Sequence, residues 1–234
     1  MAKELKNLLV NWLHDRALKQ AIRSHATGDL LDVGCGRKPY AEMIAPFVAS
    51  HVGIDYPGSP HEQSAINVYG RAERLPFREE SFDTVLCTAV LEHLAEGRAA
   101  VDEAFRVLKP GGTAIYSVPF IWHLHEEPHD YYRYSKYGLD YVFKTAGFSV
   151  ESIEPLSGFW VTFGQLFVYN IYRFNVGPLR FFPIIPLVGL LVQLFALLLD
   201  QIDRSPQWTW MYLIIARKRD QNEFEGDSVL SEIE

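Results

Sequence analysis

The sequence predicts an α/β protein with an open, mostly parallel sheet of seven strands and helices on both faces. Short apolar runs alternate with segments whose apolar residues recur at helical spacing, which is the pattern of consecutive βαβ units. The chain has 234 residues, of which 48% are hydrophobic and 22% are charged. It is therefore long enough to bury the core of one such domain. No internal repeat is visible.

The first expected element is an amphipathic helix in residues 1–27 that packs on the domain. Its apolar residues are spaced along one helical face and do not form the unbroken core of a signal peptide. These residues are Leu5, Leu8, Leu9, Trp12, Leu13 and Ala17.

Seven strands are expected in the domain that we place at residues 28–218. The first, at 30–36, is a short apolar run that ends in glycines, as a buried strand followed by a tight turn does. The others are expected at residues 51–56, 65–69, 82–90, 112–119, 148–153 and 208–216.

Helices are expected between these strands, at residues 41–48, 98–108 and 135–146. The second ends at Lys109-Pro110-Gly111-Gly112, because proline cannot continue a helix and glycine can turn the chain. Strands that alternate with helices form right-handed βαβ units, so most of the sheet is expected to be parallel.

A hydrophobic helical insertion, residues 157–207, separates the last two expected strands. Residues 181–199 contain no charged side chain, so their length passes the test for a membrane-spanning helix. A crossing is disfavoured, because the last strand must return to the same sheet. Pro183 and Pro186 are expected to limit the helix to residues 187–199, which rise roughly 20 Å against a hydrocarbon core of about 30 Å.

The charge and cysteine content limit the possible partners and compartment. A formal net charge of −7 argues against a nucleic-acid partner, since such binding depends on Lys and Arg. Cys35 and Cys87 lack metal-ligand spacing and indicate a reducing compartment. The acidic tail, residues 219–234, is expected to be disordered. We expect a cytoplasmic protein, with peripheral contact to the cytoplasmic membrane face as an open alternative.

A ligand site is expected where the first two strands end. Gly34 and Gly36 allow the backbone to turn sharply and to approach a ligand closely. Asp55 ends the second strand about 20 residues downstream, where a carboxylate can accept both ribose hydroxyls. This pattern indicates an adenosine-type ligand without choosing among such ligands.

Four signatures occur together: LLDVGCG, VGIDY, AERLPFREESFDTVLCTAVLEHL and AFRVLKPGG. In this order they resemble the class I S-adenosylmethionine-dependent methyltransferases, and more narrowly the methyltransferase-type-11 subgroup. The resemblance covers residues 28–155. It implies a Rossmann-like fold and S-adenosylmethionine as the cofactor.

The resemblance also implies a role for particular residues. Asp32, Gly34 and Gly36 would hold the methionine part of the cofactor, and Asp55 would hold the ribose. Thr88 would contact the methionine part or the sulfonium, and the adenine would lie beside the Ala72-Glu73 pair. The family often has an acidic residue before this pair, whereas this chain has Arg71. Adenine recognition must then rely more on backbone groups and stacking, or the loop sits differently. The implied cofactor-binding residues are Asp32, Gly34, Gly36, Asp55, Ala72, Glu73 and Thr88.

Methyl transfer from a sulfonium is an in-line displacement, so holding the reacting atoms in line supplies most of the catalysis. A base is needed only if the acceptor must lose a proton. His93 is one candidate, although it could simply bond to neighbouring backbone at a helix start. Residues 122–139 form the second candidate region, because this connection forms part of the acceptor site in related methyltransferases.

Within that region, His129 is the candidate base and Asp130 the group that orients it. Tyr131, Tyr132 and Arg133 are candidates for binding the acceptor. Alternatively, the tyrosines pack the segment onto the domain and Arg133 pairs with an acidic neighbour, Asp130 or Glu127. The reaction needs no metal, so none is expected, although His123, His125 and His129 lie near Glu126 in the sequence.

The sequence therefore predicts an S-adenosylmethionine-dependent methyltransferase for a small or lipid-linked acceptor in cell-surface glycan, lipid or quinone metabolism. A nucleic-acid methyltransferase is disfavoured, because Thr88-Ala89-Val90-Leu91 replaces the Asn/Asp-Pro-Pro-aromatic element. A non-catalytic module that uses the insertion to bind a partner remains an alternative. Whether or not the protein is an enzyme, residues 159–203 are expected to form a membrane-contacting helix, a homodimer surface or a lid over an apolar acceptor.

Overall fold

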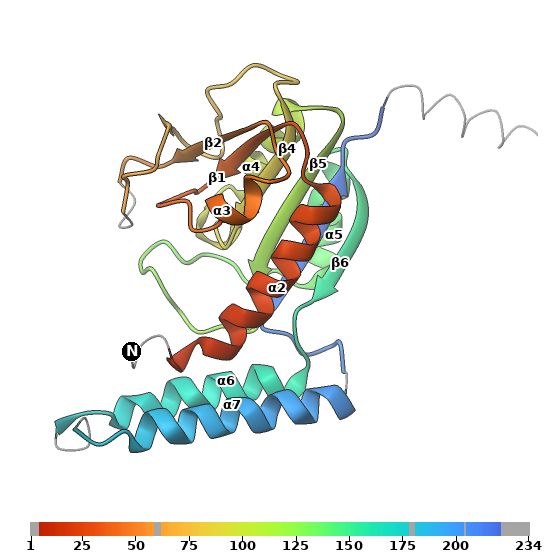
Figure 1. Ribbon diagram of the computed structural model, residues 1–234. Coiled ribbons are helices and arrows are strands. Elements are labelled where there is room, and N and C mark those ends of the chain that lie inside the picture. The colour runs from red at the N-terminus through yellow and green to blue at the C-terminus, as the bar shows by residue number, and fades with distance from the viewer. Residues whose placement is uncertain (1–4, 59–61, 178–180, 204, 221–234) are drawn as a thin grey trace, which may run out of the picture.

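The computed structural model describes residues 5–58, 62–177, 181–203 and 205–220, and its core is a seven-stranded sheet (Figure 1). The strand order is β3-β2-β1-β4-β5-β7-β6, in which only β7 runs antiparallel to its neighbours. The predicted α/β class is therefore confirmed. The strands are β1 (Asp29–Val33), β2 (Ser50–Asp55), β3 (Val68–Tyr69), β4 (Phe82–Thr88), β5 (Leu108–Pro119), β6 (Ser149–Pro155) and β7 (Met211–Arg217).

The seven strands differ from their expected bounds by one to four residues, and the differences at β3 and β5 have local reasons. β3 has two residues instead of five: at Asn67, just before it, the backbone N donates to Gly53 O at 2.9 Å, but Gly53 N donates to the side-chain Oδ1 of Asn67 at 2.8 Å and not to a backbone oxygen. β5 begins at Leu108 instead of 112, because the chain passes directly from a helix into the sheet, where Leu108 pairs with Phe82.

Helices cover both faces of the sheet, as the alternating side chains of β1 require. Successive strand residues point to opposite faces. Leu30 packs with residues of α2 and α3, whereas Leu31 packs with residues of α4 and α5. The helices are α2 (Leu8–His25), α3 (Ala41–Ile44), α4 (Gly97–Val107), α5 (Lys136–Thr145), α6 (Phe159–Ile171) and α7 (Ile184–Ile202), with 3-10 turns η1 (Leu91–His93) and η2 (Tyr172–Phe174).

The N-terminal helix packs on the domain as predicted. Its buried residues include Val10, His14, Leu18 and Ile22, which recur every fourth position and so lie on one face. Three of the four are apolar and anchor the helix against β5 and β7. The fourth, His14, places a polar side chain on the buried face.

The hydrophobic insertion forms an antiparallel helix pair, α6 and α7, which crosses the end of the molecule beyond the sheet (Figure 1). Asp200 near the end of α7 accepts hydrogen bonds from Gly158 N at 2.6 Å and Trp160 N at 2.9 Å, at the start of α6. Gly164 allows close packing, because a Cβ there would lie 2.9 Å from the Ala196 Cβ. The two helices are thus held together where α6 begins and α7 ends, and again further along at Gly164.

The α7 helix is longer than the predicted range of 187–199, because it starts at Ile184 and contains Pro186. Pro186 lies in the first turn, where backbone N–H groups have no partner within the helix, so proline is tolerated there. Among the described residues, α7 is the one helix long and apolar enough to cross a membrane by length and composition, and only 17% of its most apolar window is buried.

Two buried glutamines tie the helix pair to the N-terminal segment. Gln193 Oε1 accepts a hydrogen bond from Leu9 N at 2.9 Å, and its Nε2 donates to Leu5 O at 2.9 Å. Gln165 Nε2 donates to Lys6 O at 2.8 Å. The predicted tail, 219–234, lies outside the described residues except for its first two.

Candidate active site

The glycine bend after β1 lies beside Asp55, as the sequence predicted. Gly34 has φ +72°, and a Cβ there would lie 2.3 Å from the Val90 side chain, so only glycine fits. Gly36 N donates to Asp55 Oδ2 at 2.8 Å, while Tyr56 N donates to Oδ1 at 2.7 Å. A carboxylate offers about four lone-pair sites, so Asp55 keeps capacity for two hydroxyl donors. The bend and the carboxylate therefore fit an adenosine ribose.

The Asp32 side chain points from β1 toward β2. It is 3% exposed, and its Oδ2 lies 3.0 Å from His51 Nε2. The contact joins the two strands just before the glycine bend. Its predicted role at the methionine part of the cofactor thus stays a prediction, and the contact in the structure is with His51.

The Ala72-Glu73 pair follows β3, which runs parallel to the end of β2. The pair therefore lies at the same carboxyl edge of the sheet as Asp55. Arg71, which stands where the family often has an acid, has its guanidinium 5.6 Å from the Tyr56 ring centre and 3.4 Å from Glu73 Oε1. Arg71 is therefore turned toward an aromatic ring and a carboxylate. The adenine contacts predicted for this pair remain predictions.

A cavity of about 230 Å³ opens at the carboxyl ends of β4 and β5. Thr88, the residue predicted to face the reactive end of the cofactor, lies in its wall. Trp122, Trp210 and Met211 form an apolar side, and α2 contributes a second, polar side. The lining residues are Asn11, His14, Tyr40, Thr88, Ala89, Glu92, Pro119, Trp122, His125, Trp210 and Met211.

His14 holds a fixed position in this wall. Its Nε2 lies 3.0 Å from Ser117 Oγ on β5, and its Nδ1 lies 3.2 Å from the Tyr40 hydroxyl. Burial raises the pKa of Tyr40 to about 12, so this hydroxyl keeps its proton at neutral pH. The sequence analysis missed His14. The signal was a polar residue on the apolar face of the N-terminal helix.

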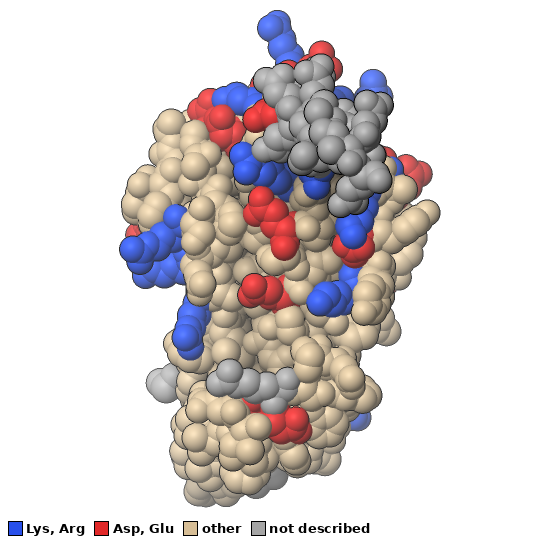
Figure 2. All heavy atoms as spheres, turned by 90° about the vertical axis from the view of Figure 1, so that its right-hand side faces the viewer, with Lys and Arg blue, Asp and Glu red and all other residues tan. Residues whose placement is uncertain are grey.

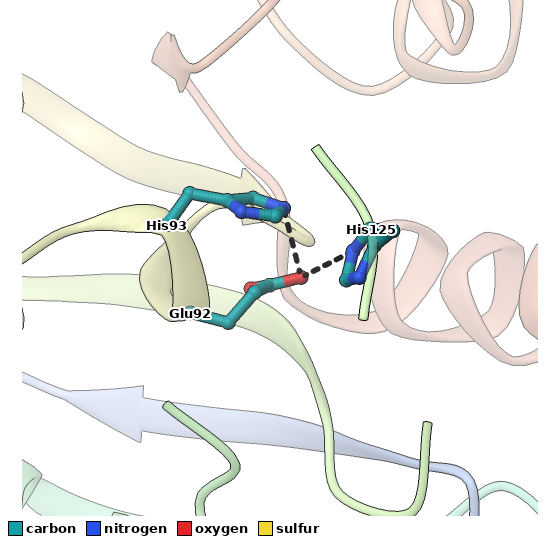
Figure 3. A group of neighbouring side chains, drawn as sticks. All are labelled: Glu92, His93 and His125. Carbon is teal, nitrogen blue, oxygen red and sulfur yellow. Dashed lines mark ion pairs between the residues drawn. The ribbon is translucent and has the colours of Figure 1, made fainter. Parts of the chain in front are cut away.

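Glu92 is the most unusual group in the cavity wall. It lies in η1 with no exposed surface, and neither carboxylate oxygen has a hydrogen-bond partner among the described residues. Burial raises the pKa of its carboxyl to about 8. Figure 3 shows the rings of His93 and His125 directed at this carboxylate. Their Nε2 atoms lie 3.7 and 3.9 Å from Glu92 Oε1.

The region after β5 differs in detail from the sequence-based expectation. Asp130 does not orient His129: its carboxylate pairs with Arg133, accepts from His125 N at 3.0 Å, and lies 3.3 Å from His125 Nδ1. The Arg133 hydrogen bonds hold the pKa of Asp130 well below its usual range. The pairing with Arg133 was one of the stated alternatives.

The candidate base His129 is exposed, and its ring Nδ1 lies 3.2 Å from the Tyr131 hydroxyl. It is not among the residues that line the cavity. Its backbone oxygen instead lies 2.7 Å from His93 Nδ1, so the segment positions His93. Tyr131 and Tyr132 are attached to η1, since both backbone N–H groups donate to Glu92 O.

The fold is Rossmann-like, with a glycine bend beside a carboxylate at the carboxyl ends of its first two strands. Comparison with known proteins makes this specific. Residues 31–116 match the family model described as a methyltransferase domain. The chain is 30% identical over 196 residues to a ubiquinone biosynthesis O-methyltransferase of Pseudomonas fluorescens (strain Pf0-1), covering 75% of this chain and 78% of the relative.

Solved structures agree on the fold. An S-adenosylmethionine-dependent methyltransferase from Mesorhizobium loti superposes with a TM-score of 0.51 at 15% identity, covering 85% of this chain and 96% of that one. The [4+2]-cyclase SpnF superposes with a TM-score of 0.55 at 20% identity, covering 87% and 80%. This chain belongs to the class I S-adenosylmethionine-dependent methyltransferases, in the methyltransferase-type-11 subgroup.

Proposed function

We propose that the protein transfers the methyl group of S-adenosylmethionine to a hydroxyl oxygen on an apolar aromatic acceptor of the quinone-precursor class. The observation that carries this proposal is the two-sided cavity beside Thr88. Its aromatic and thioether walls suit a flat apolar ring, and its polar side suits a hydroxyl. The name of the Pseudomonas fluorescens relative supports the same acceptor class.

The cofactor residues are proposed from the same geometry. Asp55 would hold the ribose, and the Gly34–Gly36 bend would lie against the methionine part, with Thr88 at the reactive end. When bound, the cofactor supplies a methyl group activated by its sulfonium. The chain holds the acceptor oxygen in line with that methyl group, and the apolar walls exclude water from it.

The acceptor proton leaves toward the polar side of the cavity. His14, Glu92 and His125 are the titratable groups in this wall, together with the Tyr40 hydroxyl. His129 and Asp130, the candidate pair from the sequence, lie behind His93 and His125 and act through them. We therefore infer that both are positioning residues.

The experiment is a turnover assay with purified protein, S-adenosylmethionine and a phenolic quinone precursor. Mass spectrometry should detect an O-methylated product together with S-adenosylhomocysteine. A matched saturated-ring alcohol of similar size should react poorly, because it has no flat π face to place against the aromatic wall formed by Trp122 and Trp210. Cofactor binding without turnover on any phenolic acceptor would instead favour the non-catalytic alternative.

We further infer that the α6–α7 pair contacts a membrane surface from the cytoplasmic side. The exposed apolar side chains of α7 recur at helical spacing along one face, and α6 adds an adjacent stripe. The surface at this end of the molecule is mostly uncharged on the face seen in Figure 2. The exposed residues are Trp160, Phe163, Phe167, Phe174, Phe181, Phe182, Ile184, Leu187, Val188, Leu191, Leu194, Phe195, Leu198 and Ile202.

Lipid fits this face better than a second copy of the chain. Protein interfaces carry about one hydrogen bond per 100–200 Å². Residues 184–199 offer no exposed polar side chain, because their one polar residue, Gln193, is buried and bonded to the N-terminal segment. Both ends of the pair connect to neighbouring strands β6 and β7, so the helices lie on the membrane and do not cross it.

Flotation with phosphatidylcholine vesicles tests this contact. Wild type should float, and replacing Leu191 and Leu198 together with Gln should release it from the vesicles. Tyr141→Gln, at a similarly exposed site on α5, serves as the control and should still float. A wild-type protein that stays with the soluble fraction, or a dimer that the double variant dissociates, would overturn the membrane assignment.

A further inference from the structure

We propose that Glu92, His93 and His125 form a binding site for one divalent metal ion of the zinc type, in the wall of the acceptor cavity. The three ligand atoms lie within 4.8 Å of one another. Two imidazoles and one carboxylate are a donor set that suits zinc and related ions. The site is argued from these side chains alone, and only its role in the reaction rests on the proposed function.

The distances fit an ion better than they fit direct contacts. Charge-assisted hydrogen bonds between imidazolium and carboxylate are about 2.7–2.9 Å long. Here the Nε2 atoms of His93 and His125 lie 3.7 and 3.9 Å from Glu92 Oε1. Ligand atoms that bind zinc tetrahedrally at about 2.1 Å are separated by roughly 3.4 Å. The two distances to Glu92 therefore need shifts of a few tenths of an ångström, and the two imidazole nitrogens, which lie within 4.8 Å, must approach each other by at most about 1.4 Å.

Glu92 is the group that most needs a cation. Its carboxylate is fully buried, without a hydrogen-bond donor among the described residues. A buried carboxylate without a partner is costly, so it either takes up a proton or is paired with a cation.

The tautomer of His93 leaves its lone pair facing Glu92. Its Nδ1 lies 2.7 Å from the backbone oxygen of His129, which can only accept a hydrogen bond. Nδ1 therefore carries the proton, and Nε2 of the neutral ring presents a lone pair. A metal-binding histidine usually has this arrangement, in which its second nitrogen donates to a carbonyl or carboxylate.

His125 is oriented in the same way by the groups behind it. Two acceptors surround its Nδ1: His123 O at 3.2 Å and Asp130 Oδ2 at 3.3 Å. The Arg133 guanidinium also lies 3.3 Å away, but its shorter hydrogen bonds go to those same two acceptors, at 2.9 and 2.6 Å. Nδ1 is then the donor, and a second lone pair faces Glu92. Two lone pairs and a carboxylate repel unless a cation or a proton lies between them.

The site is open toward the cavity. Glu92 and His125 both line it. On the other side, Glu126 Oε2 lies 3.7 Å from His93 Nε2 and offers a fourth donor. An acceptor hydroxyl bound at the open position loses its proton to solvent more readily, as metal-bound water does. The resulting oxyanion forms the new O–C bond as the S–C bond breaks, which leaves a neutral thioether.

The test is direct metal binding to the chelator-treated full chain, with Zn²⁺ followed by calorimetry and Co²⁺ followed by visible absorption. We expect one ion per chain and cobalt bands typical of a low-coordinate nitrogen–oxygen site. Glu92→Gln and His125→Asn should each weaken binding by more than the roughly 10–100-fold that loss of an outer-shell partner costs, because each removes a metal ligand itself. His25→Gln is the matched control, because this ring lies at the end of α2, 3.8 Å from Glu151, and should leave binding unchanged.

The melting temperature without metal verifies that each variant folds, and His93→Gln supplies a third variant if one does not. Wild type that binds neither ion with metal in excess, or binding that all three variants retain, would overturn the proposal. In either case the proposed function would stand, because cofactor binding and methyl transfer are measured separately on the wild-type chain. Conversely, metal binding without turnover of phenolic acceptors would count against the proposed function and leave the metal site standing.

Discussion

Replacing Asp55 with Ala should weaken binding of S-adenosylmethionine, because the carboxylate is placed to accept the ribose hydroxyls. Each hydrogen bond to a charged acceptor contributes about 1.5–3 kcal/mol, of which solvent recovers part. We therefore expect a loss of about 1–3 kcal/mol, or roughly 5- to 150-fold in Kd. Isothermal titration calorimetry with S-adenosylhomocysteine measures this loss without turnover.

The structure adds a second effect that must be separated from the first. Asp55 also accepts hydrogen bonds from Gly36 N and Tyr56 N, at 2.8 and 2.7 Å. The alanine variant leaves both amides without this acceptor, so the glycine bend itself loses support. Asp55→Asn keeps one acceptor oxygen and should lose less affinity than Asp55→Ala.

Asp102→Ala is a suitable control. Asp102 is an exposed carboxylate on α4 that pairs with Arg98 at 2.8 Å, on a helix that lies outside the proposed site. It removes the same charge from the protein and should leave Kd unchanged. If Asp55→Ala binds the cofactor as wild type does, with an unaltered melting temperature, the ribose assignment is wrong.

Three further predictions concern stability and reactivity. Gly34→Ala should lower the free energy of unfolding by about 1–3 kcal/mol or more, since φ is +72° and the new Cβ would meet Val90. Gly177→Ala is the control, because its φ is also positive but no atom lies within 4 Å of the new Cβ. Thermal denaturation should show a smaller loss of unfolding free energy for Gly177→Ala than for Gly34→Ala. Glu103→Gln should destabilise the protein by about 1 kcal/mol at pH 7 and by less at pH 3. The Arg106 hydrogen bond lowers the pKa of Glu103, so the stability that the carboxylate contributes is lost as the pH falls through that pKa. Denaturant titrations at both pH values measure the two losses, and equal losses would contradict this reasoning. Cys35 should resist iodoacetamide at pH 8 until the protein unfolds, since burial raises its pKa to about 12 and the thiolate is the reactive form. Mass spectrometry counts the adducts, and labelling of Cys35 in the folded protein would refute this prediction.

The cofactor side of the site could be predicted from the sequence because its parts are local. Gly34 and Gly36 follow β1 directly, and Asp55 ends the adjacent parallel strand, so the topology alone brings them together. The strand ends and the α/β class follow from hydrophobic periodicity in the same way. These features depend on spacing along the chain and on the general rules of parallel sheets.

The acceptor side could not be predicted, because its contacts are made between distant segments. His14 reaches Ser117 across 103 positions of sequence, from a helix outside the family match. Asp130 has three neighbouring partners of suitable chemistry, and only the path of the loop decides that His125 and Arg133 are chosen over His129. The position of Glu92 likewise depends on a distant segment, because the backbone N–H groups of Tyr131 and Tyr132 donate to Glu92 O and hold the loop against η1.

The hydrogen bonds that Gln165 and Gln193 make to the N-terminal segment decide where the chain can be shortened. A chain that starts at residue 28 would keep every strand and the whole family match. It would nevertheless lose the helix that carries Asn11 and His14, and with it one wall of the cavity. The amides of Gln165 and Gln193 would lose their backbone partners inside an apolar helix pair. The smallest folded unit that keeps the acceptor site therefore includes the segment before the sheet.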